Sequence, residues 1–153
     1  MKVLIAGASG ALGTPLTRAL IAAGHEVLGV ARSPESRDHL SHLGAHPILA
    51  NVMERDDLLR AVSGVQADAV IHALTALKKT PLRHQDMYAT NALRDGGTTN
   101  LLAAAREVGA RRFVAESIHF LPAISARWRC RCKQVADNPA RLNQSKCSSR
   151  EAG

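Results

Sequence analysis

Three glycines near the amino terminus constrain the fold more than any other feature of the sequence. Gly7, Gly10 and Gly13 recur at every third position of one short segment. The mostly apolar residues 2–6 come directly before this segment, and such a run suits a buried parallel strand. After it, apolar side chains recur at helical spacing, at Leu12, Leu16, Ala19, Leu20 and Ala23. The region therefore predicts a strand, a tight glycine turn and a helix.

A glycine loop between a strand and a helix is typical of a site that binds the phosphates of a dinucleotide. Gly7 would permit the tight turn, Gly10 would let the backbone approach a pyrophosphate, and Gly13 would let the helix pack closely on the sheet. Free N–H groups at the start of the helix would face the phosphates. The alternative is that the glycines serve only a turn and a packing contact. The strand before and the helix after favour binding, by Gly7, Ala8, Ser9, Gly10, Ala11, Leu12 and Gly13.

The alternation of strand and helix continues to about residue 118. Four further apolar runs predict strands at residues 26–31, 46–50, 69–72 and 112–115. Amphipathic stretches between them predict helices at about residues 34–43, 56–62 and 85–108. Strands that alternate with helices predict an α/β fold with a doubly wound parallel sheet, because each right-handed crossover must hold a helix. We expect five strands in the order 3-2-1-4-5.

The end of the second predicted strand bears on the choice of cofactor. An acidic residue there commonly binds the hydroxyls of the adenosine ribose, whereas an arginine suits a 2′-phosphate. Here Ala31 stands in the usual acidic place and Arg32 follows it. A guanidinium can pair with a phosphate through two hydrogen bonds. We therefore expect NADP to bind in preference to NAD, the alternative being that Arg32 is a solvated loop charge.

Several further segments join the glycine loop in one family pattern. They are Ile71-His72-Ala73 at the end of the fourth strand, Asn91, residues 97–105 in the long helix and residues 112–117 around the fifth strand. With Arg32, these segments resemble the extended and atypical short-chain dehydrogenase/reductases of the NAD(P)-dependent epimerase/dehydratase type. The resemblance covers residues 1 to about 118. It implies a Rossmann-like, NAD(P)-binding domain over 1–118.

The resemblance also implies contacts at the carboxyl ends of the strands. Ala31, Arg32 and Ser33 would contact the adenosine ribose or its phosphate. Asn51 and Val52 would lie near the adenine, although Asn51 stands where an aspartate is common in the family, which leaves a side-chain acceptor there. Ala73 and Leu74 would line the cofactor groove. Asn91 and Asn100 would be structural or cofactor-side residues, and His72 is expected to stabilise the strand end rather than act as an acid or base.

The family's catalytic groups are not matched by this sequence. In the resemblance, a tyrosine followed four residues later by a lysine provides the proton, assisted by a hydroxyl residue just after strand five. Tyr88 is the only tyrosine; it precedes strand five, and Ala92 stands in the lysine position. Ile118 and His119 occupy the place of the assisting hydroxyl. We assign no catalytic residue.

The composition changes abruptly after Ile118. Residues 119–153 hold seven basic and two acidic residues, a charge of +5 out of the chain's net +7. All three cysteines and the single tryptophan also fall there, without periodicity. The Cys-x-Cys pair matches neither a disulfide framework nor a zinc spacing, so we expect no metal. We predict an irregular basic tail, and we hypothesise that it is read out of frame and that the domain is truncated.

Two functions follow from these observations. One is an NADP-binding domain of an epimerase/dehydratase-like oxidoreductase that is catalytically incomplete in this chain. The other is a non-catalytic module that senses the dinucleotide and reports it through protein contacts. Nucleic-acid binding ranks last, since the tail has no recognition-helix pattern.

Two further expectations concern location and association. No apolar run is long enough for a membrane span, so we expect a cytoplasmic protein. The uncovered end of a truncated sheet predicts self-association. The small-molecule substrate is not indicated.

Overall fold

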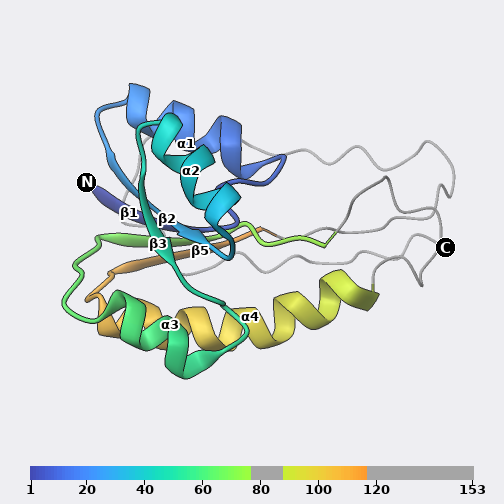
Figure 1. Ribbon diagram of the computed structural model, residues 1–153. Helices are drawn as coiled ribbons and strands as arrows, with labels where there is room; N and C mark the ends of the chain where they lie inside the picture. The colour runs from blue at the N-terminus through green and yellow to red at the C-terminus, as the bar shows by residue number, and fades with distance from the viewer. Residues whose placement is uncertain (77–87, 117–153) are drawn as a thin grey trace, which may run out of the picture. The chain divides into compact units, whose positions relative to one another are not determined.

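The computed structural model describes residues 1–76 and 88–116, which form an α/β unit (Figure 1). The strands are β1 (Lys2–Ala6), β2 (Glu26–Ala31), β3 (His46–Leu49), β4 (Ala69–His72) and β5 (Arg112–Ala115). The helices are α1 (Gly13–Ala22), α2 (Pro34–His42), α3 (Arg55–Val62) and α4 (Tyr88–Glu107). The predicted tail and the expected start of the long helix at residues 85–87 lie outside the described residues.

The five strands form one parallel sheet in the order β3-β2-β1-β4-β5. The central strand β1 pairs with β2 on one side, where Val3 lies opposite Val27, and with β4 on the other, where Val3 lies opposite Ala69. The predicted fold class and strand order are confirmed. The order reverses beside β1, so the loops after β1 and β4 diverge at the carboxyl end of the sheet, where doubly wound folds bind ligands.

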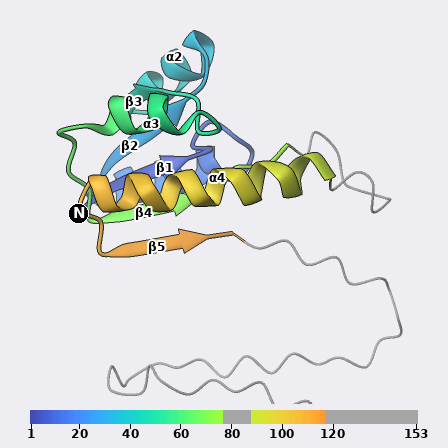
Figure 2. The same ribbon diagram turned by 90° about the horizontal axis from the view of Figure 1, so that it is seen from below.

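Helices cover both faces of the sheet, and each face has its own apolar core. Figure 1 shows α1 and α2 on one face and α3 and α4 on the other, and Figure 2 shows α4 lying along the sheet. On the α1/α2 face, Ile5 and Leu40 are fully buried. On the α3/α4 face, Leu4, Leu58 and Leu101 are fully buried. Because both faces of the sheet are buried, the sequences of the strands are continuous apolar runs rather than alternating ones.

Local signals set the helix ends. Ser33 caps α2 by accepting the Ser36 N–H at 3.3 Å, and Pro34 occupies the first turn, where its missing N–H costs nothing. Of the apolar stripe predicted for α1, Leu16 and Leu20 are partly buried and pack against the α1/α2 core. Leu12 is 47% exposed, whereas Gly13 and Thr17 are buried. The close approach of α1 selects small side chains for the contact, so the larger apolar residues lie one position away.

Strand β5 forms an exposed edge within the described residues. Only Phe113 packs partly into the α3/α4 core, while Val114 on the other face is 53% exposed. Exposed edges and apolar side chains favour association with further chain. Within the described ranges, no helix is both long and apolar enough to cross a membrane.

Candidate functional site

A pocket of about 210 Å³ opens at the carboxyl end of the sheet. The segments that follow β1, β2, β3 and β4 form its wall, together with one residue each of β2, α2 and α4. The lining residues are Gly7, Ser9, Gly10, Val30, Arg32, Ser36, Ala50, Asn51, Val52, Met53, Ala73, Leu74, Thr75 and Leu93. The pocket therefore lies where the strand order reverses, which is the expected ligand position for this topology.

The glycine loop makes a cradle that side chains would fill. Gly7 has a φ of 87°, which a residue with a side chain rarely adopts, and a Cβ there would meet the carbonyl oxygen of Ala73. A Cβ on Gly13 would collide with the carbonyl oxygen of Gly7 and come within 2.7 Å of the Ala8 backbone. We had predicted that Gly13 would let the helix approach the sheet; instead it lets α1 approach the loop. The Gly10 N–H closes the turn on the Gly7 carbonyl at 3.0 Å.

Helix α1 begins directly behind this cradle. Its first turn has no side-chain cap and no acidic residue. The positive end of the helix dipole favours an anion at this position. The loop and α1 together therefore fit a dinucleotide pyrophosphate.

The end of β2 contributes Arg32, which is exposed and lines the pocket beside Ser36 of α2. No ion pair within the described residues involves Arg32. Ala31 is buried, with 1% of its surface exposed, and Ser33 is engaged in capping α2. Of the three residues predicted for the adenosine ribose, only Arg32 thus reaches the pocket.

The loop after β3 is braced from two sides. The Asn51 side-chain oxygen accepts the Met53 N–H at 3.1 Å, so the acceptor that we expected to face the adenine is already engaged. The Asn51 backbone N–H donates to Asp57 of α3 at 2.9 Å. From α4, Asn100 donates to the carbonyl oxygens of Val52 and Met53, at 2.9 and 3.2 Å. Asn100 therefore supports the pocket wall from outside.

The end of β4 carries a buried histidine. His72 is 2% exposed, and its Nδ1 accepts the Leu74 N–H at 3.3 Å. Burial lowers the pKa of His72 below its ordinary value of 6.5, assisted by the charge of Arg94; hydrogen bonds to the backbone at His72 and Arg94, and the charge of Glu116, act in the opposite direction. Arg94 pairs with Glu116 at 3.4 Å. His72 is thus neutral at pH 7, and its ring accepts a backbone hydrogen bond from the Leu74 N–H.

The structure gathers eight of the fourteen predicted residues in the pocket: Gly7, Ser9, Gly10, Arg32, Asn51, Val52, Ala73 and Leu74. Ala8 is buried beneath the loop, and Ala11 and Leu12 are exposed outside the pocket. The prediction missed Val30, Ser36, Ala50, Met53, Thr75 and Leu93. For Val30, Ala50, Met53 and Thr75 a signal existed, because each is next to a predicted site residue; Ser36 and Leu93 come from helices.

The residues weighed as catalysts do not reach the pocket. Tyr88, at the start of α4, is 64% exposed and is absent from the lining, as is the exposed Ala92. Across residues 1–76 and 88–116, no group of three or more metal-ligating side chains is placed to hold a metal ion. The cysteines of the tail lie outside these ranges.

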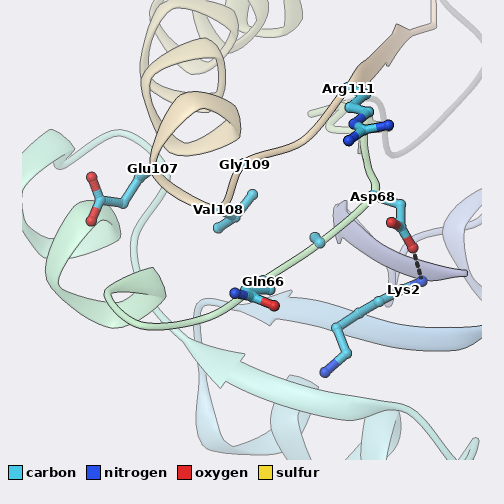
Figure 3. Close-up of a pocket in the computed structure, with 8 residues that line it drawn as sticks. Lys2, Gln66, Asp68, Glu107, Val108, Gly109 and Arg111 are labelled. Carbon is cyan, nitrogen blue, oxygen red and sulfur yellow. Dashed lines mark hydrogen bonds between the residues drawn. The ribbon is translucent and has the colours of Figure 1, made fainter.

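A larger pocket, of about 590 Å³, lies at the opposite, amino end of the sheet (Figure 3). Its lining includes Lys2, Asp68, Glu107 and Arg111. The Lys2 N–H donates to Asp68 at 2.7 Å, as the dashed line in Figure 3 shows, and the Arg111 N–H donates to the Asp68 carbonyl oxygen at 3.1 Å. This pocket has neither a glycine cradle nor a helix amino terminus, so we assign the candidate site to the smaller one.

The NAD dependent epimerase/dehydratase family model matches residues 3–118. The match spans all the described strands and helices, including the glycine cradle and β5. The chain therefore belongs to this family, and its described residues form the family's dinucleotide-binding domain.

Similar proteins agree with this assignment. A 3-diazoavenalumate denitrifying reductase of a Streptomyces species is 40% identical over 124 residues, which are 80% of this chain and 40% of that protein. The photosystem II assembly factor Ycf39 of Synechocystis sp. is 32% identical over 77% of this chain and 34% of its own length. The solved structure of the Bordetella bronchiseptica enzyme WbmG in complex with NAD is 28% identical, with a TM-score of 0.56 over 75% of this chain and 36% of WbmG. The chain thus spans about two fifths or less of these proteins.

Proposed function

We propose that the chain provides the NADP-preferring dinucleotide-binding domain of an epimerase/dehydratase-like oxidoreductase. The observation that carries the proposal is the position of Arg32, an exposed guanidinium without an ion-pair partner among the described residues, beside Ser36 in the pocket wall. A guanidinium can bind a 2′-phosphate through two parallel hydrogen bonds. The nearby start of α2 adds the positive end of a helix dipole.

One acidic residue opposes this preference. Glu35 lies in the first turn of α2, and a hydrogen bond from the Ser33 hydroxyl lowers its pKa, so its carboxylate is charged at neutral pH. A phosphate beside Arg32 would feel that charge through solvent, where salt screens it strongly. The guanidinium contact therefore outweighs the repulsion, and Glu35→Gln should strengthen NADP binding slightly.

A nicotinamide dinucleotide supplies the hydride donor or acceptor when it is bound. The residues of this chain bind and orient it: the glycine cradle and α1 hold the pyrophosphate, and the Ala73–Thr75 wall lines the groove. No Tyr-x3-Lys sequence occurs in the chain, so we propose that its catalytic groups are incomplete. The substrate would be a small molecule bound by parts of the relatives that this chain does not span.

Binding of the two cofactors tests the proposal. The full chain is titrated with NADPH and NADH at pH 8, with the fluorescence of the reduced nicotinamide as the signal. The wild type should bind NADPH at least tenfold more tightly. Arg32→Gln should weaken NADPH binding by about ten- to hundredfold, since a charged hydrogen bond contributes about 1.5–3 kcal/mol, and leave NADH binding nearly unchanged.

Arg37→Gln is the matched control. Arg37 is also on the surface near the start of α2, but it pairs with Asp38 at 3.0 Å and does not line the pocket. This variant should bind both nucleotides like the wild type. Equal affinity of the wild-type chain for NADPH and NADH would exclude the NADP preference.

The second candidate is a non-catalytic module that senses the dinucleotide. The lack of Tyr-x3-Lys and the similarity to a protein named as an assembly factor support it. Cross-linking of the full chain to partner proteins with and without NADPH separates the two functions, because only a sensing module would report the nucleotide through protein contacts. Self-association through the exposed edge of β5 is a separate proposal. It is tested by sedimentation at several concentrations, where a single monomeric species would contradict it.

A cytoplasmic location stays a prediction that cell fractionation can check.

A further inference from the structure

We propose that His72 is a positioning residue for the dinucleotide pocket. By accepting the Leu74 N–H at Nδ1, it holds the Ala73–Thr75 wall in place, so that nucleotide binding and protonation of His72 oppose one another. This inference rests on the proposed function of the pocket.

Backbone hydrogen bonds hold the pocket wall after β4 at several points. The Ala73 N–H donates to the Ala6 carbonyl oxygen of β1 at 2.9 Å. The Ala76 N–H donates to the buried hydroxyl of Thr90 at 3.2 Å. Between them, the Leu74 N–H donates to His72 Nδ1 at 3.3 Å. Of these three acceptors, only the imidazole can take up a proton near neutral pH.

Protonation of His72 removes the acceptor that holds Leu74. The observed bond assigns the neutral ring to the tautomer with its proton on Nε2. A second proton must go to Nδ1, where it would point at the Leu74 N–H and turn an attraction between donor and acceptor into a clash of two donors. The wall must then move. Because Leu74 and its neighbours Ala73 and Thr75 line the pocket, this movement changes the site where the nucleotide binds.

The surroundings of the ring oppose a positive charge. His72 is 2% exposed, and its Nε2 has no hydrogen-bond partner among the described residues. The charged groups that act on it are Arg94 of α4, which disfavours the imidazolium, and Glu116 after β5, which favours it. On the β1 side the register partner is the uncharged Ala6. Burial and Arg94 together lower the pKa of His72 below 6.5.

The coupling predicts a defined pH dependence. If the nucleotide binds only the pocket with neutral His72, its affinity is constant above the pKa of His72 and falls below it. If protonation of His72 prevents nucleotide binding completely, the dissociation constant rises tenfold for each unit by which the pH falls below that pKa. The same fall applies to NADH and NADPH, because the histidine faces a wall that both share.

Two variants separate the acceptor from the bulk of the side chain. His72→Asn places an amide oxygen close to the position of Nδ1, so it can accept the Leu74 N–H at every pH. His72→Gln extends further and carries its polar atoms towards the Nε2 position, where they cannot serve Leu74. The asparagine variant should therefore retain nucleotide binding and lose the pH dependence, whereas the glutamine variant should bind weakly throughout.

The first measurement needs no nucleotide. The Leu74 amide resonance and the His72 ring nitrogens of the full chain are followed by NMR from pH 8 to pH 4.5. We expect both to change with one midpoint below 6.5, and we expect the Leu74 resonance of His72→Asn to show no such step. A Leu74 resonance that does not follow protonation of His72 in this range overturns the proposal.

The second measurement is the affinity for NADH over the same pH range. NADH is the probe because the 2′-phosphate of NADPH titrates itself near pH 6. The affinity should fall with the midpoint given by NMR in the wild type and stay flat in His72→Asn. An equal pH dependence in these two proteins would overturn the coupling.

A surface histidine provides the control. His39 of α2 bonds to Thr14 of α1 at 3.2 Å, close to the glycine cradle. His39→Gln should keep the wild-type midpoint; loss of the pH dependence in this variant would transfer the effect from His72 to His39. If neither NADH nor NADPH binds at pH 8, the proposed function and the coupling both fail, and the Leu74 titration still decides whether His72 holds the wall.

Discussion

The two ends of the parallel sheet carry pockets of different character. The amino-end pocket is the larger, at about 590 Å³ against about 210 Å³, but it has neither a glycine cradle nor a helix amino terminus. Asp68 accepts the Lys2 N–H, and the Lys2 ammonium pairs with Glu26 at 2.9 Å. At the carboxyl end, α1 starts without a cap and Arg32 has no ion-pair partner among the described residues. The glycine cradle and the start of α1, more than volume, distinguish the carboxyl end as the candidate site.

The largest effect should come from closing the glycine cradle. Gly13→Ala places a methyl group against the Gly7 carbonyl and the Ala8 backbone, so α1 must move away from the loop. We expect a roughly hundredfold loss of NADPH affinity and a loss of about 1–3 kcal/mol in the free energy of unfolding. Fluorescence titration and urea unfolding would measure both.

Gly109→Ala tests the same change at the amino end. Gly109 also adopts a positive φ, of 69°, but a Cβ there meets no atom within 4 Å. Backbone strain should cost about 1–2 kcal/mol of stability while NADPH affinity stays at the wild-type value. Similar losses of affinity in the two variants would break the distinction between the ends.

The next effect concerns the wall after β3. Asn100→Leu removes the donors to the carbonyl oxygens of Val52 and Met53. Two lost hydrogen bonds should lower the free energy of unfolding by about 1–3 kcal/mol and weaken NADPH binding several-fold. Asn91→Leu, at an exposed position of the same helix, is the control for both measurements and should change neither quantity appreciably.

A smaller effect links stability to pH. The pKa of His72 is lowered in the folded state, so the unfolded chain binds more protons between that value and 6.5. The free energy of unfolding should therefore fall as the pH drops below 6.5, by at most about 1.4 kcal/mol per pH unit for one proton, and level off below the folded pKa.

Variants of the same cluster identify the group responsible. His72→Asn should remove this part of the slope in urea unfolding between pH 4.5 and 8. Glu116→Gln removes the anion that favours the imidazolium, so the NMR midpoint of His72 should move to lower pH. A midpoint that moves upward would reverse the electrostatic argument.

The smallest effect should come from the amino end. Asp68→Ala removes the acceptor of the Lys2 N–H, which is worth about 0.5–1.5 kcal/mol of stability. NADPH affinity should remain that of the wild type, as measured by the same titration. A tenfold weaker affinity would indicate that the amino-end pocket takes part in binding.

The strand pattern could be predicted because burial on both faces leaves long apolar runs that glycines interrupt. The same reasoning was only partly right for α1, since Leu16 and Leu20 of the apolar stripe pack against the core but Leu12 and Ala19 are exposed. Close packing instead buries Gly13 and Thr17. Periodicity shows that a helix has an apolar face; it does not show which small residue the neighbouring backbone requires.

The candidate site was predictable where it is built from strand ends, since the carboxyl ends of parallel strands meet at one edge. Ser36 and Leu93 were missed because they reach the pocket from helices whose orientation the sequence does not show. The ion pair of Arg94 with Glu116 was also missed, because it joins different elements and follows no period.

The central position of β1 has a consequence for synthesis on the ribosome. Its partner β2 follows within one helix, but the edge that pairs with β4 stays open while residues 32–68 are translated. At elongation rates of about 5–20 residues per second, that interval lasts on the order of 2–7 s. A nascent chain thus exposes the unpaired backbone and apolar face of its innermost strand for seconds, which makes this strand a natural target for chaperones that bind extended segments.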